Sequence, residues 1–125
     1  MGCKYNLMYH IILVTKYRKK LLITYGNFVK KCIEEISLKY NFRVECMEVD
    51  KDHIHILIKT KPSQTPSFIV SLIKQITTFK LYQDYKKELK TIFYKRDIFW
   101  SSGYFINTIG NASEETIKEY IKNQG

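Results

Sequence analysis

The segment His53–Thr60 constrains the fold more than any other part of this sequence. Its three isoleucines fall on one face of a strand, whereas His53 and His55 fall on the opposite face. The preceding segment, Phe42–Val49, also alternates, and Asp50-Lys51-Asp52 between the two is a turn. The pattern predicts a β-hairpin with one apolar face, which needs helices or another sheet to cover it.

The rest of the chain supplies those helices and two further strands. Apolar residues at helical spacing predict amphipathic helices from about Tyr25 to Lys39 and, after a loop over Lys61–Pro66, from Phe68 to about Tyr82. Strand patterns occupy Leu7–Thr15 and Tyr104–Ile109, and Ser113 begins a last helix in which Glu114 and Glu115 follow the cap. Residues 83–102 give no clear pattern beyond a short extended piece around Ile98 to Trp100.

This order, β-α-β-β-α-β with an added C-terminal helix, predicts an α+β, ferredoxin-like fold (split βαβ, RRM-like). In that fold two helices cover one face of an antiparallel sheet and leave the other face open. The 125 residues contain no repeat or linker and fit one domain, residues 1–125.

Composition narrows the setting in which the chain works. The longest apolar run is far shorter than the ~20 residues of a membrane helix, and no cleavable leader opens the sequence. Cys3, Cys32 and Cys46 are odd in number and widely spaced, which is typical of reduced thiols. We therefore expect a cytoplasmic protein without membrane contact.

The chain is basic, with 21 Lys and Arg against 12 Asp and Glu and a net charge of +9. Cations with interleaved aromatic residues favour nucleic acid, because they replace phosphate counterions while rings stack on bases. The alternative is a Lys-rich surface that only maintains solubility. The candidate nucleic-acid-binding residues lie in two clusters, Lys16, Arg18, Lys19 and Lys20 in the first and Lys95 and Arg96 in the second.

His53 and His55 are candidate metal ligands, because two imidazoles at i and i+2 of a strand can converge on one ion. Asp52 could orient an imidazole or close the turn. A chance pair on a solvated face is the alternative for an isolated His-x-His. His10 has no motif of its own, and a packing role is favoured over ligation.

The predicted C-terminal helix adds a second constellation. Tyr120 and Gln124 are spaced i, i+4, so a phenol lies one turn from an amide. Such a pair could bring a nucleophile and an oxygen ligand to the same metal. The alternative is a helix whose tyrosine packs and whose glutamine is solvated.

Taken together, these residues resemble the site of the small single-tyrosine insertion-sequence transposases of the HUH superfamily. The resemblance covers nearly the whole chain. Its motifs are Tyr9-His10, Thr15-Lys16-Tyr17-Arg18, Asp52-His53-Ile54-His55-Ile56-Leu57, Gly103-Tyr104-Phe105, Gly110-Asn111 and the segment from Glu115 to Gln124. Lys51 departs from the proline that many members have before Asp-His, which affects the turn more than the chemistry.

The resemblance implies a specific activity on single-stranded DNA at insertion-sequence ends. It implies that His53, His55 and Gln124 hold a divalent metal, Mg²⁺ or Mn²⁺. Tyr120 would attack the scissile phosphate, form a 5′-phosphotyrosine and release a 3′-OH that later rejoins a strand. It also implies DNA hairpins as partners, a homodimer with active sites shared between subunits, and a prokaryotic cell.

Two other classes of function remain open at this level. The first is a non-catalytic or domesticated single-stranded nucleic-acid (hairpin) binding protein on the same fold, although no RNP1-like motif is present. The second is a phosphoesterase with paired His-x-Ser/Thr motifs, or a plain metallohydrolase, for which the sequence lacks the second motif and a carboxylate cluster. Substituting Tyr120→Phe separates these classes, since only the transposase requires that phenol.

Overall fold

The computed structural model describes residues 7–109, which form a four-stranded sheet with two long helices. The elements follow the order β-α-β-β-α-β, with one 3₁₀ turn after the first strand. Their bounds are β1 Leu7–Val14, η1 Lys16–Arg18, α1 Leu22–Tyr40, β2 Arg43–Val49, β3 His53–Thr60, α2 Pro66–Lys90 and β4 Phe105–Ile109.

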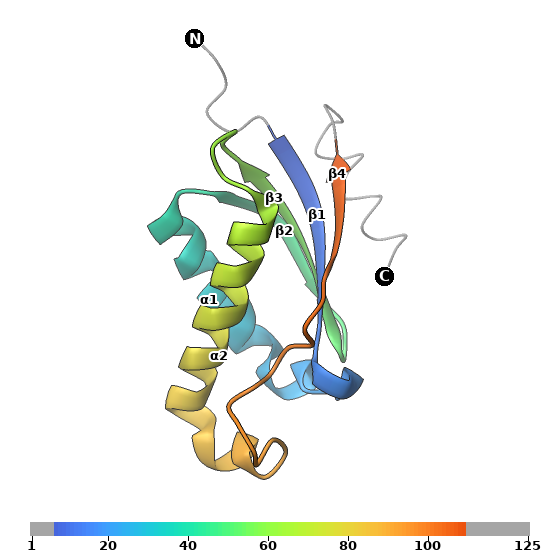
Figure 1. Cartoon of the computed structure of the whole chain (residues 1–125), viewed down its shortest axis with the longest axis vertical. Coiled ribbons are helices and arrows are strands. Elements are labelled where there is room, and N and C mark those ends of the chain that lie inside the picture. Colours follow the sequence, from blue (N-terminus) through green and yellow to red (C-terminus); the bar gives the residue numbers. More distant parts are fainter. Residues whose placement is uncertain (1–6, 110–125) are drawn as a thin grey trace.

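The sheet has the strand order β2-β3-β1-β4, and every neighbouring pair is antiparallel. Both helices lie on the same side of it, as Figure 1 shows. The α+β, ferredoxin-like fold class is therefore confirmed. The predicted C-terminal helix beginning at Ser113 lies outside the described residues, as does Cys3.

The two faces of β3 have different surroundings. Ile54, Ile56 and Ile58 are fully buried in the main core, which contains side chains from both helices. His55 and Leu57 alternate with them and so project from the opposite face. The predicted alternation is confirmed, and it places the histidines away from the helices.

The hairpin and the first helix match their predicted positions closely. The backbone amide of Asp50 donates to the carbonyl of His53 (2.8 Å), closing the turn between β2 and β3. Helix α1 begins three residues earlier than predicted and has no side-chain cap; the amide of Leu22 donates to the carbonyl of Lys51 instead. Helix α1 ends at Tyr40, and Asn41 after it takes the left-handed conformation (φ 58°) that closes many helices.

The second helix is longer than predicted. It continues past Tyr82 to Lys90, through a kink at Tyr85 (φ −130°). Residues 83–90 carry mostly charged side chains, and only Tyr85 and Leu89 turn inward. The helical spacing of apolar residues therefore ends near Tyr82, although the helix itself continues to Lys90. Phe68 and Phe79, expected on the buried face, are 51% and 64% exposed.

The chain after α2 crosses beneath the end of β1 before it forms β4 (Figure 1). Trp100 pairs with Thr15 as an isolated bridge, which agrees with a short extended piece near residues 98–100. The indole nitrogen of Trp100 also donates to Thr77 Oγ1 (2.9 Å), and Phe99 is buried. These contacts fix the segment against α2 and β1.

Cys32 is a buried thiol, and Cys46 is half-buried. Within residues 7–109 no helix is both long enough and apolar enough to cross a membrane.

Candidate functional site

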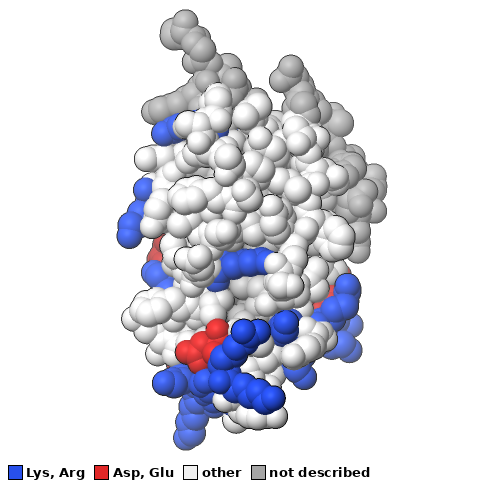
Figure 2. Space-filling model, in the orientation of Figure 1, with Lys and Arg blue, Asp and Glu red and all other residues white. Residues whose placement is uncertain are grey.

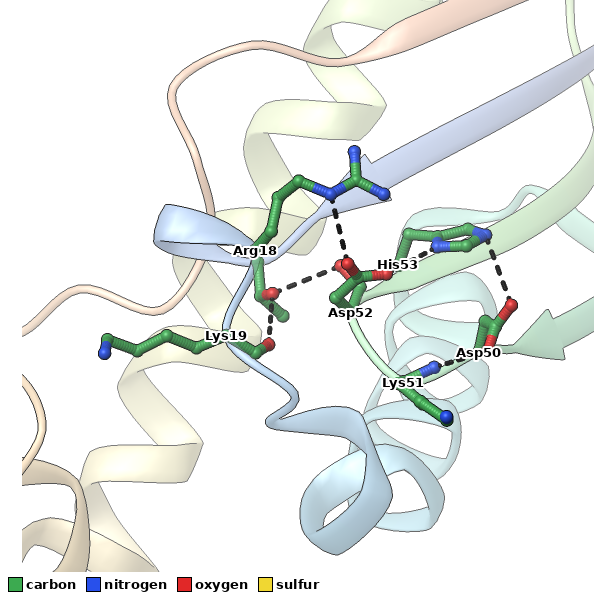
Figure 3. Close-up of polar contacts among 7 residues, drawn as sticks. Arg18, Lys19, Asp50, Lys51, Asp52 and His53 are labelled. Atoms are coloured by element: carbon green, nitrogen blue, oxygen red, sulfur yellow. Dashed lines mark hydrogen bonds and ion pairs between the residues drawn. The ribbon is translucent and has the colours of Figure 1, made fainter.

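The turn between β2 and β3 places His53 at the edge of a network of polar side chains. The Nδ1–H of His53 donates to Asp52 Oδ1 (2.8 Å), and Nε2 lies 3.9 Å from Asp50 Oδ2. Figure 3 shows the imidazole between these two carboxylates. Because a carboxylate only accepts, Asp52 holds the hydrogen on Nδ1, so the metal-binding form of this ring has its lone pair on Nε2.

His55 is fixed by a residue from the neighbouring strand. His10 on β1 reaches it across the sheet, with 3.0 Å between His10 Nε2 and His55 Nδ1 and the rings stacked at 5.2 Å. His53 and His55 stand edge to face, with ring centroids 5.0 Å apart. The structure thus brings the predicted pair together and adds a third imidazole.

Burial and charge keep two of these rings neutral. Burial, together with the smaller effect of the neighbouring His55, lowers the pKa of His10 to about 4. The pKa of His55 is also lowered, first by burial and then by His53, against the opposing effect of Glu48 and Asp50. Neutral imidazole is the form that binds metal ions.

The sheet face that carries the histidines is not open at this point, contrary to the expectation. His10 is 1% exposed and His55 is 4% exposed. Met8 and Leu57 form a second small core on that face, with Cys46 and Ile109 packed against it. The buried His55 Nε2 has no hydrogen-bond partner among the described residues.

Arg18 ties the 3₁₀ turn to this network. Its Nε donates to Asp52 Oδ2 (3.1 Å), while Asp52 accepts from His53 through its other oxygen. Thr15 Oγ1 donates to the carbonyls of Lys19 (2.6 Å) and Asp52 (3.1 Å), joining the same two loops (Figure 3). The hydrogen bond from His53 is the main reason that the pKa of the Asp52 carboxyl is lowered, with Arg18 contributing.

The remaining predicted cations lie at the same end of the molecule. Figure 2 shows Lys and Arg gathered over the lower part of the face, at the end of α2 and the segment after it. Lys19, Lys95 and Arg96, which are far apart in sequence, line one pocket. Lys20 is exposed and Lys16 is half-buried.

Two predicted site residues, Tyr120 and Gln124, lie outside the described residues. In the described part of the chain, no group of three or more His, Cys, Asp and Glu side chains could hold a metal ion. A metal at the histidine pair would therefore need a further ligand of another type or from another part of the protein.

Sequence reasoning missed His10 as a partner of His55. The period of two places His10 on the same face as Ile12 and Val14, and the ferredoxin-like order makes β1 and β3 neighbours. Only the register, in which Ile12 pairs with His55 and His10 with Leu57, brings the two rings into contact.

Solved structures of transposases have the same fold. A crystal structure of a transposase candidate from Deinococcus radiodurans R1 superposes with a TM-score of 0.76 and 25% identity, covering 99% of this chain and 95% of that one. A REP-associated tyrosine transposase bound to a REP hairpin has a TM-score of 0.63 at 15% identity. That comparison covers 98% of this chain and 64% of the other, and at this identity it supports the fold alone.

Sequence comparison identifies the family. The IS200 transposase of Salmonella typhimurium is 30% identical over 124 residues, which cover 97% of this chain and 78% of the relative. The ISDra2 transposase TnpA of Deinococcus radiodurans is 28% identical, over 98% of this chain and 87% of that protein. The family model described as "Transposase IS200 like" matches residues 3–124. The chain therefore belongs to the IS200-like transposase family.

Proposed function

We propose that this transposase cuts and rejoins single-stranded DNA through a covalent tyrosine intermediate. In this proposal the Tyr120 oxygen attacks the scissile phosphorus, the bond from phosphorus to the 3′-oxygen breaks, and the 3′-oxygen takes up a proton to leave as a hydroxyl. The 5′-phosphotyrosine conserves the phosphodiester energy, so a 3′-hydroxyl can reverse the step at a new junction.

The observation that carries the proposal is the arrangement of His53 and His55. Each ring has its Nδ1 engaged by another side chain, Asp52 for the first and His10 for the second. Metal-binding histidines characteristically have their second nitrogen held in this way. The buried Nε2 of His55, without a hydrogen-bond partner among the described residues, is a polar atom that a metal ion would satisfy.

These residues therefore fit a divalent metal, Mg²⁺ or Mn²⁺, held by His53, His55 and Gln124. A bound metal would withdraw charge from the scissile phosphate and make phosphorus more open to attack. This chain's own part is to hold the two imidazoles through their Nδ1 atoms, by Asp52 and His10. A free phenol has a pKa of ~10 and is a poor nucleophile at neutral pH, so Tyr120 depends on such activation of the phosphate.

Hairpins near the ends of an insertion sequence are the proposed form of the substrate. The solved tyrosine transposase of the same fold is bound to a REP hairpin, which supports this choice. The basic end of the molecule suits a nucleic-acid backbone. We further propose a homodimer in which Tyr120 and Gln124 of one subunit complete the histidine site of the other.

The deciding experiment uses single-stranded DNA that flanks the gene, labelled at its 3′ end. Each strand is incubated with protein and Mg²⁺ and run on a denaturing protein gel. We expect a labelled, metal-dependent adduct with the wild type and with the control Tyr40→Phe, and none with Tyr120→Phe. His53→Ala and His55→Ala should also lose the adduct while retaining DNA binding.

Each other outcome points to a different reading. An adduct that persists in Tyr120→Phe would move the nucleophile to another tyrosine. If DNA is bound but no adduct forms on either strand, the protein is a hairpin-binding relative on the same fold. Mixing Tyr120→Phe with His53→Ala tests the shared site, since restored adduct formation requires residues from two subunits.

A further inference from the structure

Two basic segments far apart in the sequence meet beside the polar network of Figure 3. The turn η1 and the residue after it contribute Tyr17 and Lys19, and the chain after α2 contributes residues 92–96 and 98. Between them is an open pocket of about 580 Å³, within the usual size range of ligand sites. The described residues that line this tyrosine pocket are Tyr17, Lys19, Ile92, Phe93, Tyr94, Lys95, Arg96 and Ile98.

The walls of the tyrosine pocket combine an apolar floor with a cationic rim. Phe93 is 5% exposed, whereas Tyr17 and Tyr94 are 73% and 75% exposed. Of the described residues lining the pocket, none carries a carboxylate. Nearby Asp97 is engaged in an ion pair with Lys90 (2.7 Å). The rim therefore favours an anionic group, and the exposed tyrosine rings favour a planar ring that can stack on them.

The backbone adopts a costly conformation to form this rim. Tyr17 and Arg18 are consecutive left-handed residues with φ of 59° and 51°. Each costs roughly 1 kcal/mol or more for a residue with a side chain, and such strain concentrates at functional sites. Here the turn leaves Tyr17 exposed while Arg18 donates to Asp52.

We propose that the tyrosine pocket binds one unpaired nucleotide of single-stranded DNA, an inference that rests on the proposed function. The base stacks on Tyr94 and Tyr17, and the adjoining phosphates lie against Lys19, Lys95 and Arg96. Arg18 links this pocket to the cleavage site, because it shares Asp52 with His53. A nucleotide held here keeps the neighbouring strand unpaired and beside the histidines.

The test measures binding of fluorescein-labelled dT20 and of an abasic oligonucleotide of equal length, by anisotropy. Stacking on an aromatic ring contributes about 1–3 kcal/mol per base. We therefore expect Tyr94→Ala to weaken dT20 binding by about fivefold or more, Tyr94→Phe to preserve it, and neither to change abasic binding. Lys95→Gln should weaken the binding of both oligonucleotides. It should also reduce the slope of log affinity against log salt concentration by roughly 0.7.

Matched controls come from the opposite end of the molecule. Phe68→Ala removes another exposed aromatic side chain and Lys39→Gln another exposed cation, and both should bind dT20 as the wild type does. Unchanged dT20 binding in Tyr94→Ala, or an equal loss of binding for the abasic strand, overturns the proposal that the tyrosine pocket binds a nucleotide. Either result leaves the proposed function intact. A wild type that binds neither oligonucleotide overturns both.

Discussion

His10 is the residue whose contacts most directly determine the geometry of the proposed metal site. It holds His55 Nδ1 at 3.0 Å, from a different strand and in a buried environment. When the Nδ1–H of His55 donates to His10, the lone pair of His55 is on Nε2 and points away from His10. His10 is thus a positioning residue, acting on the metal through its neighbour.

We predict that His10→Leu lowers Mn²⁺ affinity by about 10- to 100-fold, the usual cost of losing the partner of a metal-binding histidine. His10→Gln should recover part of that loss, because its amide oxygen can still accept from an imidazole N–H. Isothermal titration of Mn²⁺ into each variant measures the affinities without any DNA.

The comparison of the two variants separates positioning from packing. If His10 only fills space, Leu and Gln variants should bind Mn²⁺ equally once both are shown to be folded. Wild-type affinity in His10→Leu would mean that the His10–His55 contact does not orient the ligand.

The sequence predicted His53 and His55 because their relation is local, two residues apart on one strand. The link from His10 to His55 spans 45 positions and depends on strand register, which the sequence pattern alone leaves open. The left-handed turn at Tyr17 and Arg18 was equally unpredictable, because neither residue is a glycine or asparagine.

At the scale of elements, the chain between α2 and β4 is held by two backbone hydrogen bonds and by side chains of α2. The amide of Ser101 donates to the carbonyl of Val14, and the amide of Lys16 donates to the carbonyl of Phe99 (both 2.8 Å). Lys74 Nζ on α2 donates to the carbonyls of Ser101 (2.9 Å), Ser102 (3.1 Å) and Gly103 (2.8 Å). Tyr82 donates to the carbonyl of Ile98 (2.6 Å). These side-chain bonds add to the backbone bonds of Phe99 and Ser101, and they fix one wall of the tyrosine pocket through Ile98.

We predict that Lys74→Met lowers the free energy of unfolding by about 1–3 kcal/mol, because three carbonyls lose a charged donor. Urea unfolding at neutral pH measures this. Lys80→Met on the same helix is the control: its ion pair with Glu35 (3.4 Å) is exposed, and its loss should cost under about 1 kcal/mol. Equal effects of the two substitutions would contradict an anchoring role for Lys74.

The elements were predictable where an apolar period marked them. Strand β3 has the predicted bounds, and α1 differs by one turn at its start. The end of α2 was not predictable, because its last two turns place charged residues in solvent and contact the core only through Tyr85 and Leu89. Tyr85 packs on Tyr25 and Phe28 at ring distances of 5.0 and 5.2 Å, contacts that no local pattern encodes.

At the scale of the whole molecule, the functional groups gather at one end of the sheet. The β2–β3 turn, the turn η1 and the chain after α2 lie together there, at the end of the molecule where α1 begins and α2 ends (Figure 1). The antiparallel pairing of β1 with β3 places Val14, the last residue of β1, beside His53, so Arg18 and His53 can share Asp52. The sheet provides the rigid support, and the loops carry the chemistry.

The buried histidines also give the whole metal-free protein a distinctive dependence of stability on pH. The pKa of His10 is about 4 in the folded protein and about 6.5 when the chain unfolds, so the unfolded chain binds more protons between these values. The stabilisation from neutral His10 is complete above pH 6.5 and is lost as the pH falls toward 4. The lowered pKa of His55 acts in the same direction.

We therefore predict that wild-type protein with chelator loses about 2 kcal/mol more unfolding free energy between pH 7 and pH 5 than His10→Gln does. Urea denaturation of both proteins at these two pH values gives the difference, in which the shared titration of carboxylates cancels. If the two free energies fall in parallel, His10 is not held neutral by folding. That result would also remove the reason for expecting His10 and His55 to be neutral before a metal binds.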